Sequence, residues 1–519
     1  MKGVAATRPE RLTPGAIAKH LFCLDPDRDE RAPQLCAEML LTMVQNGYAP
    51  PAGSTQLTTP KRQLFAVRSL AVGDNFLGGR AQGRAGDDDT TPEEYGAGLA
   101  AGRETRGSAN LALARRALEG LVDPETQRGQ RGTWLLRPFH ESLLWYDARR
   151  SKPGSPEYSV RKVYMRGSGI TLARMLLDPP GHESKQLGAA AVEAIREALT
   201  GASPLADVSE KLEGVLDEGE SYTRPPDTEA DERDAWDRGS DQRLRQLADQ
   251  LCRHAEGVMR QSGASGPARL WQLRTILALD LATHVVRTAW QRTGAPQEER
   301  FLLLSFGGGP RAVDPIRQRS EEFYRRARIR LSEATVLTLA DRMEQLDADA
   351  RVDWPAEFQA RSPLGGDTED SVSSQLRGLP RHPVREDYER IARAAVEAAN
   401  YDRAAGDGFR VLLQSIGMLV GTGSYRYLTA GPELLAAMVG ALSADMPMSS
   451  RGFFAAARAE WGLVVNQETA AATALATLLD GAGLERNARK AERLMSDAGL
   501  ALGLSDRTTM VGERARRTR

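Results

Sequence analysis

The chain has 519 residues, and its 69 basic and 70 acidic residues give a formal net charge of −1. At roughly 150 residues per domain, this length predicts about three to four domains. The charge balance excludes a polycation, so any nucleic-acid site must be local. Hydrophobic residues make up 41% and charged residues 27%, as in ordinary globular proteins. Aromatic residues make up only 6%, which argues against a broad base-stacking platform.

The cysteines and the hydropathy pattern indicate a cytoplasmic protein. Cys23, Cys36 and Cys252 are too few and too scattered for a disulfide framework or a four-thiolate zinc site. The N-terminus lacks the apolar run of about 7–15 residues that marks a secretory signal. No segment approaches the roughly 18 consecutive apolar residues of a membrane span. We therefore expect no membrane partner.

Helical patterns account for most of the chain. Thr13 followed by Pro14 predicts a helix start. Arg243–Gln261 carries apolar residues at helical spacing, and Ile316–Leu346 predicts one long helix. Strands are expected at Tyr158–Met165 and Phe301–Phe306, and a hairpin at Gly421–Thr429. The predicted fold class is mainly α and multidomain, with helical bundles, small β elements and a C-terminal winged-helix-like domain.

Changes in composition suggest where domains begin and end. Residues 207–241 contain 13 acidic and 4 basic residues, which is typical of a solvated linker. The predicted division is an N-terminal helical domain (1–80), a mobile loop (81–106), an α+β domain (107–205), an acidic linker (206–242), a long-helix domain (243–349), a second linker (350–383), a helical connector (384–430), the winged-helix-like domain (431–511) and a basic tail (512–519).

Residues 431–511 have the order of a winged helix. The predicted helices are Pro432–Leu442, Arg451–Trp461, Gln467–Leu479 and Leu484–Ala498, followed by a hairpin within Leu500–Val511. The third helix would read DNA, but it contains no arginine. Only Asn466 and Gln467 at its start offer base-reading groups. A protein-binding winged helix and a DNA-binding one both remain open.

Arginines cluster after the Phe301–Phe306 strand and again in the tail. They are Arg311, Arg317, Arg319, Arg325, Arg326, Arg328 and Arg330, and then Arg514, Arg516 and Arg517. A basic helix face of this kind can neutralise phosphates, so we predict a nucleic-acid-binding surface here. The alternative is a solvated helix face in a protein that uses arginine far more often than lysine.

Catalytic motifs are incomplete. The loop Gly307–Arg311 lacks the Lys-Ser/Thr of a phosphate-binding P-loop. Asp178, Glu183 and Lys185 are similar to the acid and E-x-K elements of magnesium-dependent nucleases, but their spacing is short and Glu183 falls at a helix start. We predict no cofactor, no metal site and no enzyme activity. A divergent magnesium-dependent nuclease is the alternative.

Two segments resemble a known class of proteins. Phe301–Leu331 and the terminal sequence GLALGLSDRTTMV, residues 499–511, resemble helical accessory subunits of multi-gene prokaryotic anti-phage defence systems. This resemblance implies partner subunits that include a motor ATPase or a nuclease, and it transfers no catalytic residue. The expected function is a non-catalytic subunit that binds partner proteins and double-stranded DNA. A pure protein scaffold is a further alternative.

Overall fold

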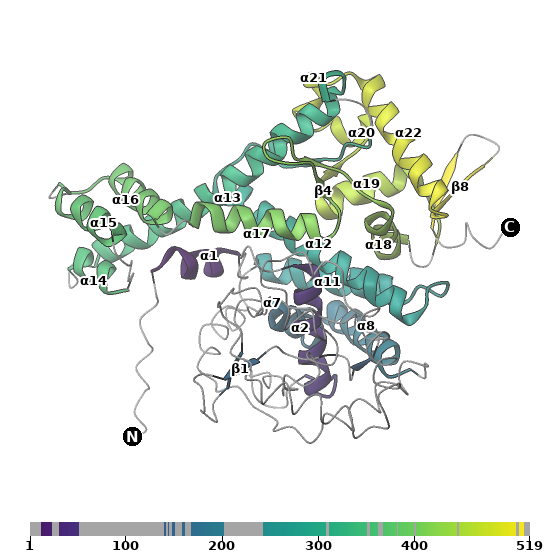
Figure 1. Cartoon of the computed structure of the whole chain (residues 1–519), viewed down its shortest axis with the longest axis horizontal. Coiled ribbons are helices and arrows are strands. Elements are labelled where there is room, and N and C mark those ends of the chain that lie inside the picture. The colour runs from purple at the N-terminus through teal and green to yellow at the C-terminus, as the bar shows by residue number, and fades with distance from the viewer. Residues whose placement is uncertain are drawn as a thin grey trace, which may run out of the picture. The chain divides into compact units, whose positions relative to one another are not determined.

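A computed structural model describes residues 12–22, 31–50, 140–141, 144, 148–150, 158–160, 168–201, 242–307, 311–349, 353–361, 367–380, 382–398, 401–443, 446–504 and 508–512. The fold is mainly helical with small β-sheets, as predicted (Figure 1). The loop at 81–106, the tail arginines and residues 206–241 of the acidic linker lie outside the described residues. No helix of the described part combines the length and apolarity needed to cross a membrane.

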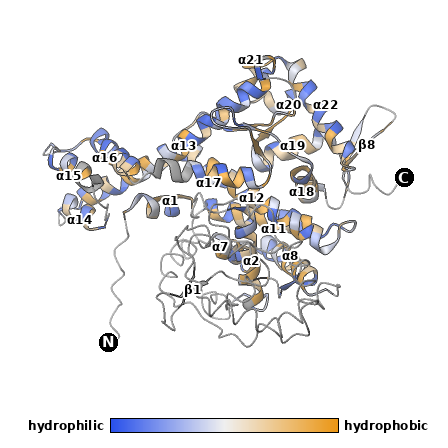
Figure 2. Ribbon diagram, viewed as in Figure 1, coloured by the Kyte–Doolittle hydropathy of each residue, from blue (hydrophilic) through white to orange (hydrophobic). Residues whose placement is uncertain are grey.

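The chain divides into two compact units. Unit 1 comprises Met1–Asp29, Leu279–Pro432 and Ser450–Ala498, and unit 2 comprises Glu30–Ala278, Glu433–Ser449 and Gly499–Arg519. Helices of both units mix hydrophobic and hydrophilic residues along their length (Figure 2). This pattern is expected of amphipathic helices that bury one face.

The described part of unit 2 is built from packed helices and two small sheets. Its helices are α2 (Ala32–Gln45), α7 (Ser168–Leu177), α8 (His182–Thr200), α11 (Gln242–Met259), the first part of α12 (Gly266–Arg292) and α18 (Pro432–Ser443). Helix α2 packs on α7, and α8 packs on α11. Leu244, Leu247 and Leu251 of α11 are buried, which confirms the predicted apolar face. Strands β1 (Ala148–Arg150) and β2 (Tyr158–Val160) pair antiparallel, so part of the predicted Tyr158–Met165 strand is present.

The contact between α2 and α7 depends on Gly169. A Cβ atom at this position would lie 2.6 Å from both Glu38 Cβ and the Leu35 carbonyl oxygen. We therefore expect Gly169→Ala to push the helices apart and lower the free energy of unfolding by about 2 kcal/mol, in the range of overpacked cores. Urea denaturation measures this. Gly503→Ala is the control, because a Cβ at Gly503 meets nothing within 4 Å. Equal stability losses in the two variants would count against the close approach.

Unit 1 is organised around the long helix α13. Its helices are α1 (Pro14–Phe22), the second part of α12, α13 (Pro315–Asp347), α14 (Trp354–Arg361), α15 (Asp367–Arg377), α16 (Arg385–Ala398), α17 (Tyr401–Ser415), α19 (Ser450–Trp461), α20 (Gln467–Ala470), α21 (Leu475–Leu478) and α22 (Gly481–Asp497), with short 3-10 turns η4 (Gln297–Glu299) and η5 (Arg311–Val313). The predicted long helix is confirmed. It begins where Asp314 Oδ1 accepts a hydrogen bond from Arg317 N at 3.0 Å, with Pro315 in the first turn.

Short strands link distant parts of unit 1. Strand β3 (Leu302–Leu303) runs parallel to β7 (Leu463–Val464), and β4 (Leu419–Val420) forms a hairpin with β5 (Tyr427–Leu428). A single parallel bridge joins Leu304 to Leu428, so the strands lie in the order β7-β3-β5-β4. The predicted Phe301–Phe306 strand is present at Leu302–Leu303. The predicted hairpin is present, but its first strand lies at Leu419–Val420, just before the predicted range Gly421–Thr429.

The C-terminal elements follow the predicted order with one correction. Strands β6 (Met448–Ser449), β8 (Ala501–Gly503) and β9 (Thr509–Val511) form a sheet in the order β6-β9-β8, so the predicted C-terminal hairpin is present. The single helix predicted at Gln467–Leu479 is wrong, because two short helices, α20 and α21, replace it. Thr473 Oγ1 donates to the Ala470 carbonyl at 2.7 Å and accepts from Leu475 N, which turns the chain between them.

Candidate nucleic-acid interface

Most of the predicted arginine surface is neutralised within the protein. Six of its seven arginines form ion pairs: Arg311–Glu321 at 2.8 Å, Arg317–Glu321 at 3.5 Å, Arg319–Glu322 at 2.6 Å, Arg326–Glu322 at 2.7 Å, Arg328–Asp407 at 3.4 Å and Arg330–Glu333 at 2.9 Å. Arg326 also pairs with Glu299 at 3.2 Å. The surface is therefore much less positive than the sequence suggests.

Arg311 and Arg317 have a structural role. Glu321 is 2% exposed, and its carboxylate faces Arg311 and Arg317. The guanidinium of Arg311 lies over the ring of Tyr425 at 4.9 Å, and that of Arg317 over Tyr427 at 4.4 Å. Moving either arginine onto a phosphate would weaken the pairing of a buried carboxylate, which is costly. We conclude that Arg311 and Arg317 hold the β4–β5 hairpin against α13.

Arg325 differs from its neighbours on α13. Its side chain is exposed, and within the described part of the chain no carboxylate forms an ion pair with it. Among the described residues, it is the arginine of this set that forms no ion pair. Arg514, Arg516 and Arg517 lie beyond the residues that the structure describes.

Helix α22 carries a cationic face that the sequence analysis did not identify. Arg486, Arg489, Lys490 and Arg493 follow the i, i+3, i+4, i+7 spacing, so they lie on one side of the helix. All four residues are exposed, and none forms an ion pair with a described carboxylate. We call these four residues the α22 cationic face. Its charge is available to an external anion, unlike most of that on α13.

Neighbouring elements contact two of the three acidic residues of α22, Glu485 and Glu492. Glu485 accepts a hydrogen bond from Gln467 N at 3.2 Å, and Glu492 accepts one from Ser450 Oγ at 2.5 Å. Each contact directs one oxygen of the carboxylate toward a neighbouring element of unit 1. The buried side of α22 includes Leu484 and Met495, so the helix is anchored with its cationic face in solvent.

Asn487 fixes the position of α22 on the sheet of unit 1. Its Nδ2 donates to the carbonyl oxygens of Leu304 and Val465, both at 2.9 Å, and its Oδ1 accepts from Phe306 N at 2.8 Å. The side chain thus bridges the carboxyl ends of the parallel strands β3 and β7. Because Asn487 is 3% exposed, these bonds are shielded from water.

The spacing of the α22 cationic face is visible in the sequence, but the winged-helix prediction assigned the reading role to Gln467–Leu479. A search for basic residues at helical spacing would have found it. What such a search cannot show is whether Glu485 and Glu492 pair with these cations, since that depends on contacts with Gln467 and Ser450.

The nuclease candidates do not form a metal-binding arrangement. Glu183 lies in the first turn of α8, which confirms that the E-x-K element begins a helix rather than a strand. Lys185 Nζ pairs with Asp178 Oδ1 at 3.3 Å, and both side chains are 56% exposed. Within the described residues, no group of three His, Cys, Asp or Glu residues could hold a metal ion. The geometry therefore gives the nuclease alternative no support.

Cys252 is a structural thiol. It is fully buried, and Sγ donates to the Met175 carbonyl at 3.5 Å. Burial, with a smaller contribution from the charge of Asp249, raises the pKa of Cys252 to about 12. Because the thiolate is the reactive form, we expect Cys252 to resist alkylation in the native protein near neutral pH and to react fully in urea. Peptide mapping by mass spectrometry measures this. Rapid native labelling would contradict the burial of the thiol.

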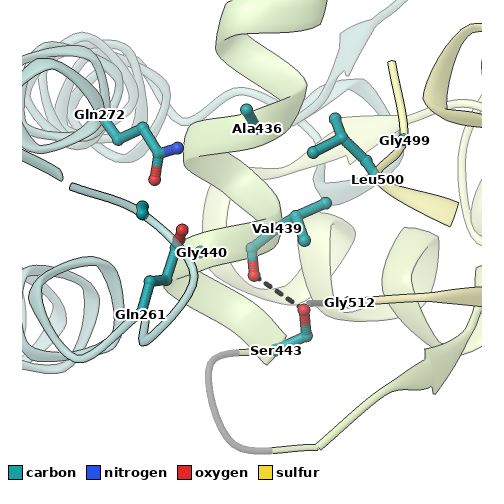
Figure 3. Close-up of a pocket in the computed structure, with 10 residues that line it drawn as sticks. Gln261, Gln272, Ala436, Val439, Gly440, Ser443, Gly499, Leu500 and Gly512 are labelled. Carbon is teal, nitrogen blue, oxygen red and sulfur yellow. Dashed lines mark hydrogen bonds between the residues drawn. The ribbon is translucent and has the colours of Figure 1, made fainter. Parts of the chain in front are cut away.

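A cavity in unit 2 is too small for a metabolite. Its walls include Gln261, Gln272, Val439, Gly440 and Ser443, and it encloses about 40 Å³ (Figure 3). This volume suits a few water molecules. Gly440 allows the Gln261 side chain to pack closely in this wall, since a Cβ at position 440 would lie 1.6 Å from Gln261 Nε2. We interpret the cavity as a packing feature.

Comparisons of this chain with protein-family models, curated proteins and solved structures found no match.

Proposed function

We propose that this chain is a non-catalytic subunit that binds nucleic acid through the α22 cationic face. The observation that carries the proposal is the set of four exposed cations on one helix face, none paired with a described carboxylate. Cations in this arrangement can each neutralise a backbone phosphate and release its counterions. Arg325 of α13 is a further cation available for such contacts.

The order of the C-terminal elements favours double-stranded DNA. The chain runs α18, β6, α19, β7, α20, α21, α22, β8 and β9, and the sheet order is β6-β9-β8. We propose that β7, α20 and α21 are insertions between the second and third helices of a winged helix. The remaining order is that of a winged helix, in which the helix before the hairpin enters the major groove. Helix α22 takes that position in the sequence, and its arginines are the residue type that reads guanine edges. We therefore propose α22, rather than residues 467–479, as the reading helix.

The partner proteins follow from the resemblance of residues 301–331 and 499–511 to accessory subunits of anti-phage systems. We propose that the chain acts in the cytoplasm beside a motor ATPase or a nuclease of such a system. In this role it would supply DNA contacts and leave the chemistry to its partners.

A salt titration tests the proposal. Fluorescence anisotropy with a labelled duplex of about 20 base pairs should show an affinity that falls linearly on a log–log plot against salt. Four phosphate contacts give a slope of about −3.6, since each contributes about −0.9. No binding, or binding indifferent to salt, would overturn the proposal and leave a protein scaffold as the alternative. That alternative predicts stable co-purification with neighbouring gene products and no DNA affinity.

A further inference from the structure

A second group of cations in unit 1 surrounds a buried tyrosine hydroxyl. Tyr324 of α13 is 4% exposed, and its hydroxyl has no hydrogen-bond partner among the described residues. Its ring stacks on Phe409 of α17, with centroids 6.1 Å apart. Buried polar groups are normally hydrogen-bonded, so an unpartnered phenol requires an explanation.

Two arginines beside this tyrosine share one carboxylate. Arg328 lies one turn after Tyr324 on α13, and Arg410 belongs to α17. Asp407 Oδ1 pairs with Arg328 Nη2 at 3.4 Å and with Arg410 Nε at 3.1 Å. The Nε of Arg328 is buried and has no partner in the described part of the protein. Arg410 also donates from Nη1 to Gln414 Oε1 at 3.0 Å. A single aspartate therefore faces two positive charges, and Arg328 keeps an unpartnered donor.

Arg426 of the β4–β5 hairpin adds a third cation. Leu428 N donates to Ser320 Oγ at 2.9 Å, and Ser320 lies one turn before Tyr324. Arg426 precedes Leu428 by two residues, so this hydrogen bond brings the segment that carries Arg426 close to the Ser320–Tyr324 turn of α13. The Nε of Arg426 is buried without a hydrogen bond, and no described carboxylate forms an ion pair with this residue.

The charges around Tyr324 agree with this placement. Burial raises the pKa of Tyr324, while the charges of Arg328, Arg426 and Arg410 oppose that rise. Three arginines and one aspartate leave an excess of two positive charges at this position. Arg328 and Arg410 have side chains 33% and 24% exposed, so this group of cations borders the protein surface.

We propose that Tyr324, Arg328, Arg410 and Arg426 bind a phosphate group. A phosphate oxyanion accepts hydrogen bonds from several directions, so it would use the phenolic O–H of Tyr324 together with the unpartnered N–H groups of Arg328 and Arg426. The phosphate belongs either to a small phosphate ester or to a nucleic-acid backbone. This site is built from residues other than those of the α22 cationic face, so the proposal stands independently of the proposed function.

Isothermal titration with inorganic phosphate, at constant ionic strength in chloride, tests the site. We expect the wild type to bind phosphate, and Tyr324→Phe and Arg426→Gln each to bind at least tenfold more weakly. Tyr324→Phe keeps the ring stack and removes only the hydroxyl, so its thermal midpoint without phosphate should equal that of the wild type. Arg393→Gln is the matched control, because Arg393 is an exposed cation of α16 without a described carboxylate partner. Its affinity for phosphate should not change.

Absence of phosphate binding in the wild type would overturn the proposal. So would an affinity for phosphate in Tyr324→Phe and Arg426→Gln equal to that of the wild type. Competition by a short DNA duplex would identify the backbone as the source of the phosphate, and lack of competition would identify a small phosphate ester. An Arg489→Glu/Arg493→Glu variant should retain phosphate binding while losing duplex affinity. This result separates the failure of one proposal from the failure of the other.

Discussion

Reversing two charges on α22 should weaken duplex binding at least tenfold and reduce its dependence on salt. In Arg489→Glu/Arg493→Glu, two of four proposed phosphate contacts are lost and two repulsive charges are added. The slope of log affinity against log salt should change from about −3.6 to about −1.8, since each contact contributes about −0.9. The loss should be similar for all DNA sequences if these residues contact only phosphates. Anisotropy titrations over a range of salt concentrations measure both quantities.

The matched control variant reverses the charge of two exposed arginines elsewhere in unit 1. Arg377→Glu/Arg393→Glu changes the net charge by the same amount on α15 and α16, so it reports the effect of overall charge alone. A second comparison variant, Arg325→Glu/Arg326→Glu, reverses the charge of two arginines of α13. Its effect should be smaller than that of the α22 variant, because Arg326 already pairs with Glu322 and Glu299. A larger loss of duplex affinity in the α13 variant would show that the DNA interface lies on α13 rather than on α22.

Replacing Asn487 with leucine should lower the free energy of unfolding by about 4 kcal/mol. The change removes three hydrogen bonds that tie α22 to the ends of β3 and β7, at 2.8–2.9 Å. Two carbonyl groups and one N–H group would remain without this partner, and each buried unsatisfied group costs about 1–3 kcal/mol. Urea denaturation followed by tryptophan fluorescence measures the loss.

Arg486→Leu provides the comparison for this variant. It introduces the same side chain one residue earlier in α22, at an exposed position, where substitutions usually change stability by less than about 0.5 kcal/mol. Equal stability of the two variants would show that Asn487 does not anchor the helix. A loss of stability confined to Asn487→Leu would instead confirm that the buried hydrogen bonds of Asn487 hold α22 in place.

Local sequence patterns predicted the secondary structure where burial is periodic. The apolar spacing in α11, the Asp314-Pro315 start of α13 and the β4–β5 hairpin are all encoded by residues close together in the chain. The break between α20 and α21 was missed, because the hydroxyl of Thr473 competes for backbone groups in a segment whose composition favours a helix. The pairing of β3 with β7 joins residues that are distant in sequence, and no local signal indicates it.

The sequence by itself determined the helical class and the positions of the basic residues, since both follow from residue type and spacing. Only the tertiary structure decided which charges are available. Asp407 lies 79 residues from Arg328, and Glu299 lies 27 residues from Arg326, yet both carboxylates pair with arginines of α13. On α22, Glu492 and Glu485 accept hydrogen bonds from Ser450 and Gln467, and the four cations form no ion pair with a carboxylate of the described residues. Ion pairing is a contact between distant segments, so it is decided by folding rather than by local composition.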